Sequence, residues 1–161
     1  MILIALGANL PSNAGSPQET CVAAIQTLGS YQIGIERVSR WYSSSAVPAS
    51  DQPPYVNGVI VAKTALNSQA LLRILLEVEK IFGRSRSVSN AARTLDLDLL
   101  AYQDEVRRAG PILPHPRLHE RAFVLLPLQD VAPEWRHPIS GKGIQAMLTA
   151  LETRESVVPI N

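Results

Sequence analysis

The sequence predicts an α+β fold, a ferredoxin-like βαββαβ sandwich with additional C-terminal helices. Short apolar runs of strand length alternate with two longer segments whose apolar residues recur at helical spacing. Their order along the chain is strand, helix, two strands, helix, strand, which is the split βαβ arrangement. No internal repeat, low-complexity tract or linker interrupts this order, so residues 1–161 are expected to form one domain.

The first helix carries a clear start signal. Residues 2–6 are an apolar run expected to form a buried strand, and a polar loop follows. Ser16 then stands at a helix N-cap position, with Pro17 first and Glu19 third in the helix, which is the capping-box arrangement. The helix is expected to run to Leu28, with the glycine that follows as its C-terminal cap.

The middle of the chain supplies two strands and a second helix. Alternation predicts a strand with an irregular middle over residues 31–43 and another over residues 55–64, separated by a loop rich in serine and proline. A helix with one apolar face is expected over residues 68–82, followed by a glycine. Glu79 falls inside that apolar face near the helix end. It either reaches a site or lies at the rim as an acid paired with an arginine.

Strict alternation over residues 93–102 predicts a strand in which Asp96 and Asp98 share one face. The opposite, core-facing set is Leu95, Leu97, Leu99 and Ala101. Two carboxylates roughly 6.6–7 Å apart on one face repel each other, and Asp is a poor strand former. One or two divalent cations would remove that cost and leave positions for a phosphate-bearing substrate. The alternative is a half-buried strand whose polar face is simply wet.

The C-terminal third adds smaller elements. A hairpin around Gln103 and Asp104 is expected to return the chain through Val106. An apolar segment at residues 122–128 and a last helix near residues 143–152 complete the predicted elements.

Composition limits the partners. The chain has 161 residues, 46% of them hydrophobic, and a net charge of +1, so a folded core is expected and neither nucleic acid nor an anionic membrane is a matching partner. The N-terminus lacks the pattern of a signal peptide and no run has membrane-spanning length, so a cytoplasmic protein is expected. Cys21 is the single cysteine and falls among core positions, which excludes an internal disulfide and a thiolate cluster.

Several cations accompany the two aspartates. They are Arg84, Arg86, Arg93, His115, Arg117 and Arg121. A lone arginine is most often a solvated surface charge, but a cluster between a helix bearing a glutamate and a strand bearing two aspartates favours phosphate, which the guanidinium binds at two points. His115 lies between two prolines on a stiff segment, which suits a phosphate contact or a structural hydrogen bond equally. The chain has neither a P-loop nor a nucleophile elbow.

An aromatic residue and a carboxamide share one face of the strand at residues 55–64. Tyr55 and Asn57 can stack on, and hydrogen-bond to, a flat heterocycle, and Phe123 is a candidate for the opposite wall. The alternative is that these are ordinary core aromatics beside an edge-strand asparagine.

Five segments, in this order and spacing, form a highly specific pattern. They are Leu6–Leu10, Asp51–Asn57, Gly83–Arg84, Arg93–Asp98 and Pro114–Leu118, with Arg121, Phe123, Val124 and Leu125 after them. With this pattern the chain resembles the 6-hydroxymethyl-7,8-dihydropterin pyrophosphokinase family along nearly its whole length.

The resemblance implies a catalytic domain that transfers pyrophosphate from ATP to the hydroxymethyl group of a reduced pterin in folate biosynthesis, releasing AMP. It implies two magnesium ions held by Asp96 and Asp98. A monomer whose partners are these two small molecules is expected. The residues implied to bind ATP or stabilise the transferred group are Glu79, Arg84, Arg86, Arg93, His115 and Arg121. Of these, Arg84 and Arg93 join the two aspartates as catalytic residues. The residues implied to bind the pterin are Ser44, Val47, Tyr55, Asn57 and Phe123.

The chain departs from the family pattern beside the aspartate motif. Many members carry a tryptophan and a Gly-Pro pair before the arginine, where this chain has Asn90, Ala91 and Ala92. Ser45 stands where a proline is common, and the loop at residues 108–111 is one residue shorter. These differences bear on loop closure and turnover rather than on the reaction.

Two other functions are compatible with the fold. One is a pterin- or nucleotide-binding module that has lost turnover, against which the retained aspartates and arginines argue. The other is an RNA-binding ferredoxin-like domain, which 5% aromatic residues and a near-zero net charge make a poor match.

Overall fold

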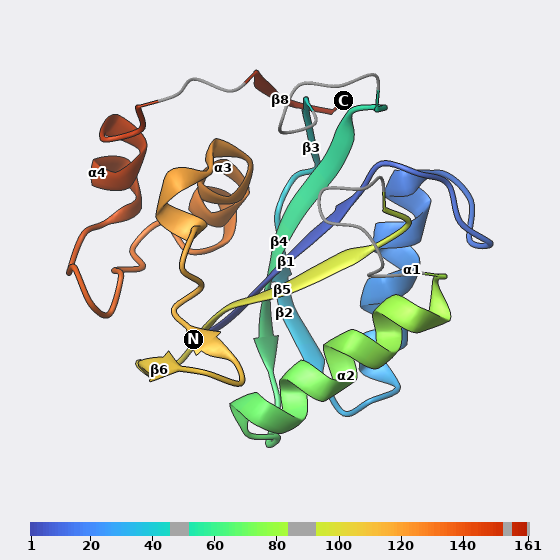
Figure 1. Ribbon diagram of the computed structural model, residues 1–161, viewed down its shortest axis with the longest axis horizontal. Coiled ribbons are helices and arrows are strands. Elements are labelled where there is room, and N and C mark those ends of the chain that lie inside the picture. The colour runs from blue at the N-terminus through green and yellow to red at the C-terminus, as the bar shows by residue number, and fades with distance from the viewer. Residues whose placement is uncertain (46–51, 84–92, 153–155, 161) are drawn as a thin grey trace.

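The computed structural model describes residues 1–45, 52–83, 93–152 and 156–160, and its centre is an antiparallel sheet (Figure 1). The strands of this sheet are β1 (Ile2–Ala8), β2 (Gly34–Val38), β3 (Tyr42–Ser44), β4 (Tyr55–Lys63), β5 (Asp96–Tyr102) and β8 (Val157–Pro159). They lie in the order β5-β1-β4-β3-β8, and β2 also pairs with β4. The central pair β1 and β4 is thus flanked by β5 and β2, which is the strand order of a ferredoxin-like sheet and confirms the predicted α+β fold.

Two helices cover one face of the sheet. They are α1 (Pro17–Gly29) and α2 (Ser68–Ile81), which Figure 1 shows side by side on the same side of the strands. The predicted capping box is present: Ser16 Oγ accepts from the backbone N–H of Glu19, and the Glu19 carboxylate accepts from the N–H of Ser16. The helix continues one residue beyond the prediction, through Gly29, and Ser30 is its C-cap.

The core beneath these helices is large and apolar. Buried members come from β1, from both helices and from β5, including Leu6, Leu28, Leu75 and Leu97. Cys21 belongs to the same cluster, as predicted, and burial raises the pKa of its thiol to about 12. After α2, Gly83 adopts a φ of +85°, a conformation that suits the predicted glycine at the end of this helix.

The C-terminal elements cover the opposite face. They are α3 (Ala122–Val131), which contains the predicted apolar segment, the 3₁₀ turn η1 (Leu118–Glu120) and α4 (Ile144–Thr149). Their apolar residues form a second cluster with Leu3 of β1 and Val59 of β4. Figure 1 shows α3 and α4 across the sheet from α1 and α2, so both faces of the strands are covered at least in part.

A β-bulge in β5 overturns one predicted side-chain direction. Leu3 pairs with Ala101 and Ile4 with Leu99, so Leu100 is an extra residue in β5. Leu100 and Ala101 therefore both belong to the cluster beneath α3, whereas Leu99 belongs to the cluster beneath α1 and α2. The prediction that Ala101 faces the same core as Leu99 is wrong, because strict alternation does not allow for an inserted residue.

The predicted strand over residues 31–43 is two strands, β2 and β3, separated by an irregular stretch. Within this stretch, Ser39 Oγ accepts a hydrogen bond from the backbone N–H of Val59 at 2.9 Å, so a side chain rather than a backbone carbonyl satisfies this N–H. The Trp41 ring lies against Gly58 of β4, where a Cβ atom would come within 2.5 Å of it. At the break, the Trp41 ring thus approaches the β4 backbone so closely that only glycine fits at position 58.

The turn after β5 lies at Gln103 and Asp104, as predicted, but the returning chain does not pair with β5. Instead β6 (Arg107–Arg108) forms a small hairpin with β7 (Ile112–Leu113). This hairpin leads into the Pro114–His115–Pro116 segment.

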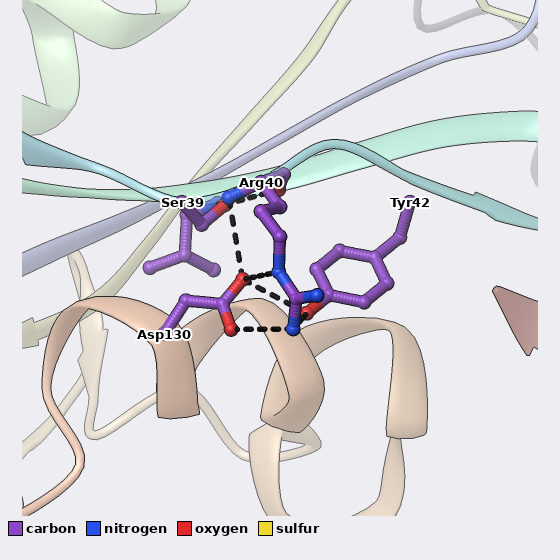
Figure 2. Close-up of polar contacts among 5 residues, drawn as sticks. Ser39, Arg40, Tyr42 and Asp130 are labelled. Atoms are coloured by element: carbon purple, nitrogen blue, oxygen red, sulfur yellow. Dashed lines mark hydrogen bonds and ion pairs between the residues drawn. The ribbon is translucent and has the colours of Figure 1, made fainter. Parts of the chain in front are cut away.

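Polar contacts fasten the C-terminal half of α3 to the sheet (Figure 2). Asp130 Oδ1 accepts from Arg40 Nη2 at 3.1 Å, and Asp130 Oδ2 accepts from the Tyr42 hydroxyl at 2.8 Å. Burial, reinforced by the hydrogen bond to Asp130, raises the pKa of Tyr42, so its hydroxyl remains a donor. Arg37 also donates to the carbonyl of Val131 at 2.8 Å. These contacts fix the position of a helix whose N-terminal half carries Phe123.

Across the described ranges, no helix combines the length and apolar character needed to cross a membrane.

Candidate functional site

A cleft of about 1090 Å³ opens on the α3 side of the sheet. Its floor is formed by β1, β4 and β5, and its walls by α3, α4 and the segments beside them. The predicted site residues that line it are Ser44, Tyr55, Asn57, Arg93, Asp96, Asp98, Arg121 and Phe123, and the candidate cation Arg117 lines it as well. The fold therefore gathers into one cavity residues that lie up to about half the chain length apart in the sequence.

The two aspartates lie on the cleft floor next to very small neighbours. In the register between β1 and β5, Asp96 lies opposite Gly7 and Asp98 opposite Ala5. Both carboxylates are partly exposed, and both β1 residues also line the cleft. Because Gly7 has no side chain and Ala5 only a methyl group, space remains beside the carboxylates for a bound group.

This pair of oxygen-bearing side chains fits a hard divalent cation such as Mg²⁺. Asp96 and Asp98 project from one face of β5 into a cleft, where water and substrate oxygens can reach them. Within the described part of the chain, no third Asp, Glu, His or Cys completes a metal-binding group. That is the donor set typical of Mg²⁺, which is commonly bound by one or two carboxylates and takes its other ligands from water and substrate phosphates.

Three arginines, Arg93, Arg117 and Arg121, line the cleft and place positive charge there. Arg93 Nη1 lies 2.8 Å from Asp96 Oδ2, and both side chains are only partly exposed. The Arg121 guanidinium carbon lies 5.4 Å from the centroid of the Phe123 ring, within the range of a cation–π contact. Arginine at these positions offers planar donors to phosphate oxygens.

The aromatic and amide residues lie at the β3–β4 end of the cleft. Ser44 pairs with Tyr55 in the sheet, and the Asn57 Nδ2 donates to Ser44 Oγ at 2.7 Å. Asn57 is buried, with 5% of its surface exposed, and its amide is therefore fixed in orientation rather than free to rotate in solvent. Tyr55 and Phe123 line the same cavity from β4 and α3.

His115 lies beside the cleft rather than among the residues that line it. Its Nδ1 accepts from the N–H of Arg117 at 3.2 Å, so the neutral ring carries its proton on Nε2. Burial, helped by the positive charges of Arg121 and Arg117, lowers the pKa of His115 to about 4. The structural hydrogen bond foreseen from the sequence is therefore present, and the ring keeps an Nε2–H donor near Arg121.

Glu79 is buried, so the predicted position at the rim of α2 is wrong. It is not at the rim of α2, because only 2% of its surface is exposed, and it is not among the residues that line the cleft. Its Oε2 accepts from the N–H of Leu97 at 2.7 Å, on the backbone between the two aspartates. In this position Glu79 supports the strand that carries Asp96 and Asp98.

Three predicted site residues, Val47, Arg84 and Arg86, lie outside the described residues. The cleft in turn includes residues that the sequence did not single out: Ala5, Gly7, His119, His137, Ser140 and Lys142. Ala5 and Gly7 follow from the register with the aspartates, which requires the strand order to be known. His119 and His137 meet only through the tertiary fold, with ring centroids 6.1 Å apart, and burial lowers the pKa of His137.

Comparison with known proteins agrees with this geometry. Residues 3–133 match the family model described as 7,8-dihydro-6-hydroxymethylpterin-pyrophosphokinase. This chain belongs to that family. The match covers every site residue named above up to Phe123.

Among its relatives is a 2-amino-4-hydroxy-6-hydroxymethyldihydropteridine pyrophosphokinase from Synechocystis, 41% identical over 121 residues, which are 74% of this chain and 62% of the relative. One of the same name from Aquifex aeolicus is 36% identical over 84% of this chain and 85% of the relative. The folic acid synthesis protein fol1 of Pneumocystis carinii is 34% identical over 84% of this chain but only 18% of its own length. The chain thus spans less than two thirds of the length of some of these relatives.

Solved structures support the fold. A Plasmodium falciparum protein described as HPPK-DHPS with pteroate superposes with a TM-score of 0.67 at 13% sequence identity, over 92% of this chain and 41% of that one. At this identity the likeness speaks for the fold alone, and it agrees with the ferredoxin-like strand order.

Proposed function

We propose that this chain transfers the pyrophosphoryl group of ATP to the hydroxymethyl group of 6-hydroxymethyl-7,8-dihydropterin, as a step of folate biosynthesis, and releases AMP. The observation that carries the proposal is the pair Asp96 and Asp98 beside Gly7 and Ala5, in one cleft with Arg93, Arg121, Tyr55 and Phe123. Family membership supports the reaction, and the cleft supplies a place for a polyphosphate and a place for a flat ring.

In this proposal the two substrates occupy opposite parts of the cleft. The pterin ring lies between Tyr55 and Phe123, with its edge bonded by Asn57 and by backbone near Ser44 and Val47. The triphosphate lies over the aspartates, and the residues assigned to it are Glu79, Arg84, Arg86, Arg93, His115 and Arg121. Glu79 contributes through the backbone of β5, since its carboxylate accepts from Leu97.

Two magnesium ions are part of the proposal, held by Asp96 and Asp98. When bound, they would neutralise phosphate charge and polarise the transferring group. The carboxylates themselves are pre-positioned by three contacts: the antiparallel register with β1, the Glu79 hydrogen bond to Leu97, and the Arg93 ion pair with Asp96.

The protein's own part in the reaction is to bind, orient and stabilise charge. The hydroxymethyl oxygen attacks the β-phosphorus, the bond from that phosphorus to the α,β-bridging oxygen breaks, and AMP leaves with the bridging oxygen. The hydroxyl proton is lost to solvent, and no protein nucleophile takes part. In this proposal Arg93 and Arg121 offset charge on the transferring oxygens, which is the main contribution a protein makes to phosphoryl transfer. The neutral His115 ring has an Nε2–H to donate.

The proposal also includes a monomer that acts in the cytoplasm on small molecules alone. A segment of Asn90, Ala91 and Ala92 in place of the family's tryptophan and Gly-Pro is expected to slow turnover rather than change the product. These three residues lie outside the described ranges.

The product distinguishes this reaction from an ordinary kinase reaction. Incubating the protein with Mg²⁺, ATP and 6-hydroxymethyl-7,8-dihydropterin should release AMP in an amount equal to the pyrophosphorylated pterin, measured by liquid chromatography and ³¹P NMR. Asp98→Asn is the matched control and should release none. Release of ADP, or of AMP without pterin, would contradict the proposal. Binding of both substrates without AMP would instead identify a binding module of the same fold.

A further inference from the structure

Asn9 is a buried polar residue at the end of β1 to which neither the cleft nor the proposed roles assign a task. Only 1% of its surface is exposed. Its Oδ1 accepts from the backbone N–H of Arg93 at 2.8 Å. Its Nδ2 donates to Gln52 Oε1 at 3.2 Å and to the carbonyl of Pro53 at 3.1 Å. One carboxamide therefore joins two segments that are about 40 residues apart in the sequence.

The first of these segments carries the residues proposed for the triphosphate. The backbone N–H groups of Asn9 and Leu10 both donate to the carbonyl of Arg93, at 3.0 and 3.1 Å. With the side-chain bond, both the N–H and the C=O of Arg93 are held by the Asn9–Leu10 corner. With its backbone held in this way, Arg93 places Nη1 2.8 Å from Asp96 Oδ2.

The second segment leads to the residues proposed for the pterin. Gln52 and Pro53 precede β4, and Tyr55 is the first residue of that strand. Asn57, two residues further on, also borders the cleft. Asn9 thus holds the segment that precedes β4 on one side and the backbone of Arg93 on the other.

We propose that Asn9 is a positioning residue that sets the two halves of the substrate cleft relative to each other. The inference rests on the proposed function, because it takes Arg93 as a phosphate contact and Tyr55 as a pterin contact. Asn9 itself touches neither substrate. It holds the residues that do, and a shift of about 1 Å in such residues is enough to cost about 100-fold in rate.

The side-chain type matters for this task. The position needs one acceptor and two N–H donors on a short planar group, which among the amino acids only asparagine supplies at this length. Asp keeps the shape and the acceptor for Arg93 but loses both donors, so it faces the Pro53 carbonyl with a carboxylate. The two bonds can therefore be separated by substitution.

The experiment compares Asn9→Asp and Asn9→Ala with the parent protein. Affinities for α,β-methylene ATP with Mg²⁺ and for the pterin are measured separately by calorimetry, and kcat and KM by AMP release. Asn9→Asp is expected to weaken pterin binding about tenfold while the nucleotide affinity stays within about threefold, because only the bonds to Gln52 and Pro53 are lost. Asn9→Ala is expected to lower kcat/KM about 100-fold and to weaken both ligands.

Ser39→Ala is the matched control, because Ser39 is also buried, loses two hydrogen bonds on substitution and is outside the cleft lining. It should lower the melting temperature without changing either affinity more than about twofold. The inference would be overturned if Asn9→Asp and Ser39→Ala each weakened the binding of nucleotide and pterin to the same extent. That result would mean a general loss of rigidity rather than a specific role for Asn9. So would Asn9→Ala with parent-like kinetics. If Asn9→Ala does not fold, the Asn9→Asp comparison alone decides. Absence of AMP from the parent protein would refute the proposed function, whereas the two affinities test Asn9 independently.

Discussion

Asp96 and Asp98 lie on one face of one strand, where two negative charges repel each other. Asp96 has an ion pair with Arg93 at 2.8 Å, in which both side chains are at most one quarter exposed. Like-charge repulsion alone would make removal of either carboxylate favourable. The ion pair offsets that gain at Asp96.

We expect Asp96→Asn and Asp98→Asn both to abolish AMP release but to differ in stability. Asp98→Asn should leave the free energy of unfolding unchanged or slightly raised, because it relieves repulsion. Asp96→Asn should lower it by about 1 kcal/mol, because Arg93 loses a partly buried partner. Urea denaturation in EDTA measures both values without bound metal. A large loss for both variants under these conditions would show that the carboxylates support the fold rather than a metal.

His115 gives a pH dependence whose direction follows from its pKa of about 4. Between this value and the ordinary value of 6.5, the unfolded chain binds a proton that the folded protein does not. The free energy of unfolding should therefore fall as the pH drops from 6.5 towards 4. In His115→Gln, the free energy of unfolding should depend less steeply on pH in this window. The difference in slope should be less than that of one full proton, which is about 1.4 kcal/mol per pH unit, because the ring is partly exposed.

Denaturation between pH 4 and 7.5 checks this dependence. His137, whose pKa is also lowered by burial, is present in both proteins and cancels in the difference. Identical slopes for the parent protein and His115→Gln would mean that His115 titrates alike in the folded and unfolded states.

At the scale of elements, the strand β5 depends on a residue of α2. Because β5 is an edge strand, its outward N–H groups need partners from outside the sheet. Glu79 supplies one, at Leu97, from a position with 2% exposure. Of the two sequence-based alternatives for Glu79, the rim position is wrong. The proposed ATP role is most simply an indirect one, through the strand.

Glu79→Gln and Glu79→Leu should separate an indirect role from a direct one. Gln keeps an acceptor for the Leu97 N–H and should retain most of the stability and the KM for ATP. Leu leaves that N–H buried without a partner and should cost about 1–3 kcal/mol, with a fall in kcat as the aspartates shift. Thermal unfolding and steady-state kinetics measure these effects. A large rise in the KM for ATP in Glu79→Gln at unchanged stability would instead indicate that the carboxylate binds the nucleotide.

The elements show what local patterns predict well. The capping box at Ser16 and the glycine after α2 are local signals, and both appear where the sequence places them. The bulge at Leu100 and the break between β2 and β3 arise from contacts with β1 and with Gly58, which lie far away in the sequence. Periodicity within a strand carries no information on such partners, so the direction of Ala101 was predicted wrongly.

At the scale of the whole molecule, the cleft depends on the pairing of distant segments. The polar and aromatic side chains of the cleft were identified from the sequence mainly through the family pattern, because the residues alone left a solvated strand face and ordinary core aromatics as alternatives. The small residues that leave room for a ligand could not, since Gly7 and Ala5 become meaningful only when β1 is known to lie beside β5. The contribution of Ser140 and Lys142 likewise requires the loop before α4 to reach the cleft.

Because the cleft joins the sheet to α3 and α4, a bound ligand should stabilise the fold as a whole. A ligand that binds only the folded protein adds about 2.7 kcal/mol at 100 times its dissociation constant. For a chain of this size that gain corresponds to a rise in melting temperature of roughly 5–10 °C. We expect this rise with Mg²⁺ and α,β-methylene ATP together, and little with either alone, because the nucleotide phosphates and Asp96 with Asp98 would share the same cations. Asp98→Asn, which should fold normally, is expected to show no rise. Scanning calorimetry tests both, and an equal rise in EDTA would mean that the nucleotide binds without the two aspartates.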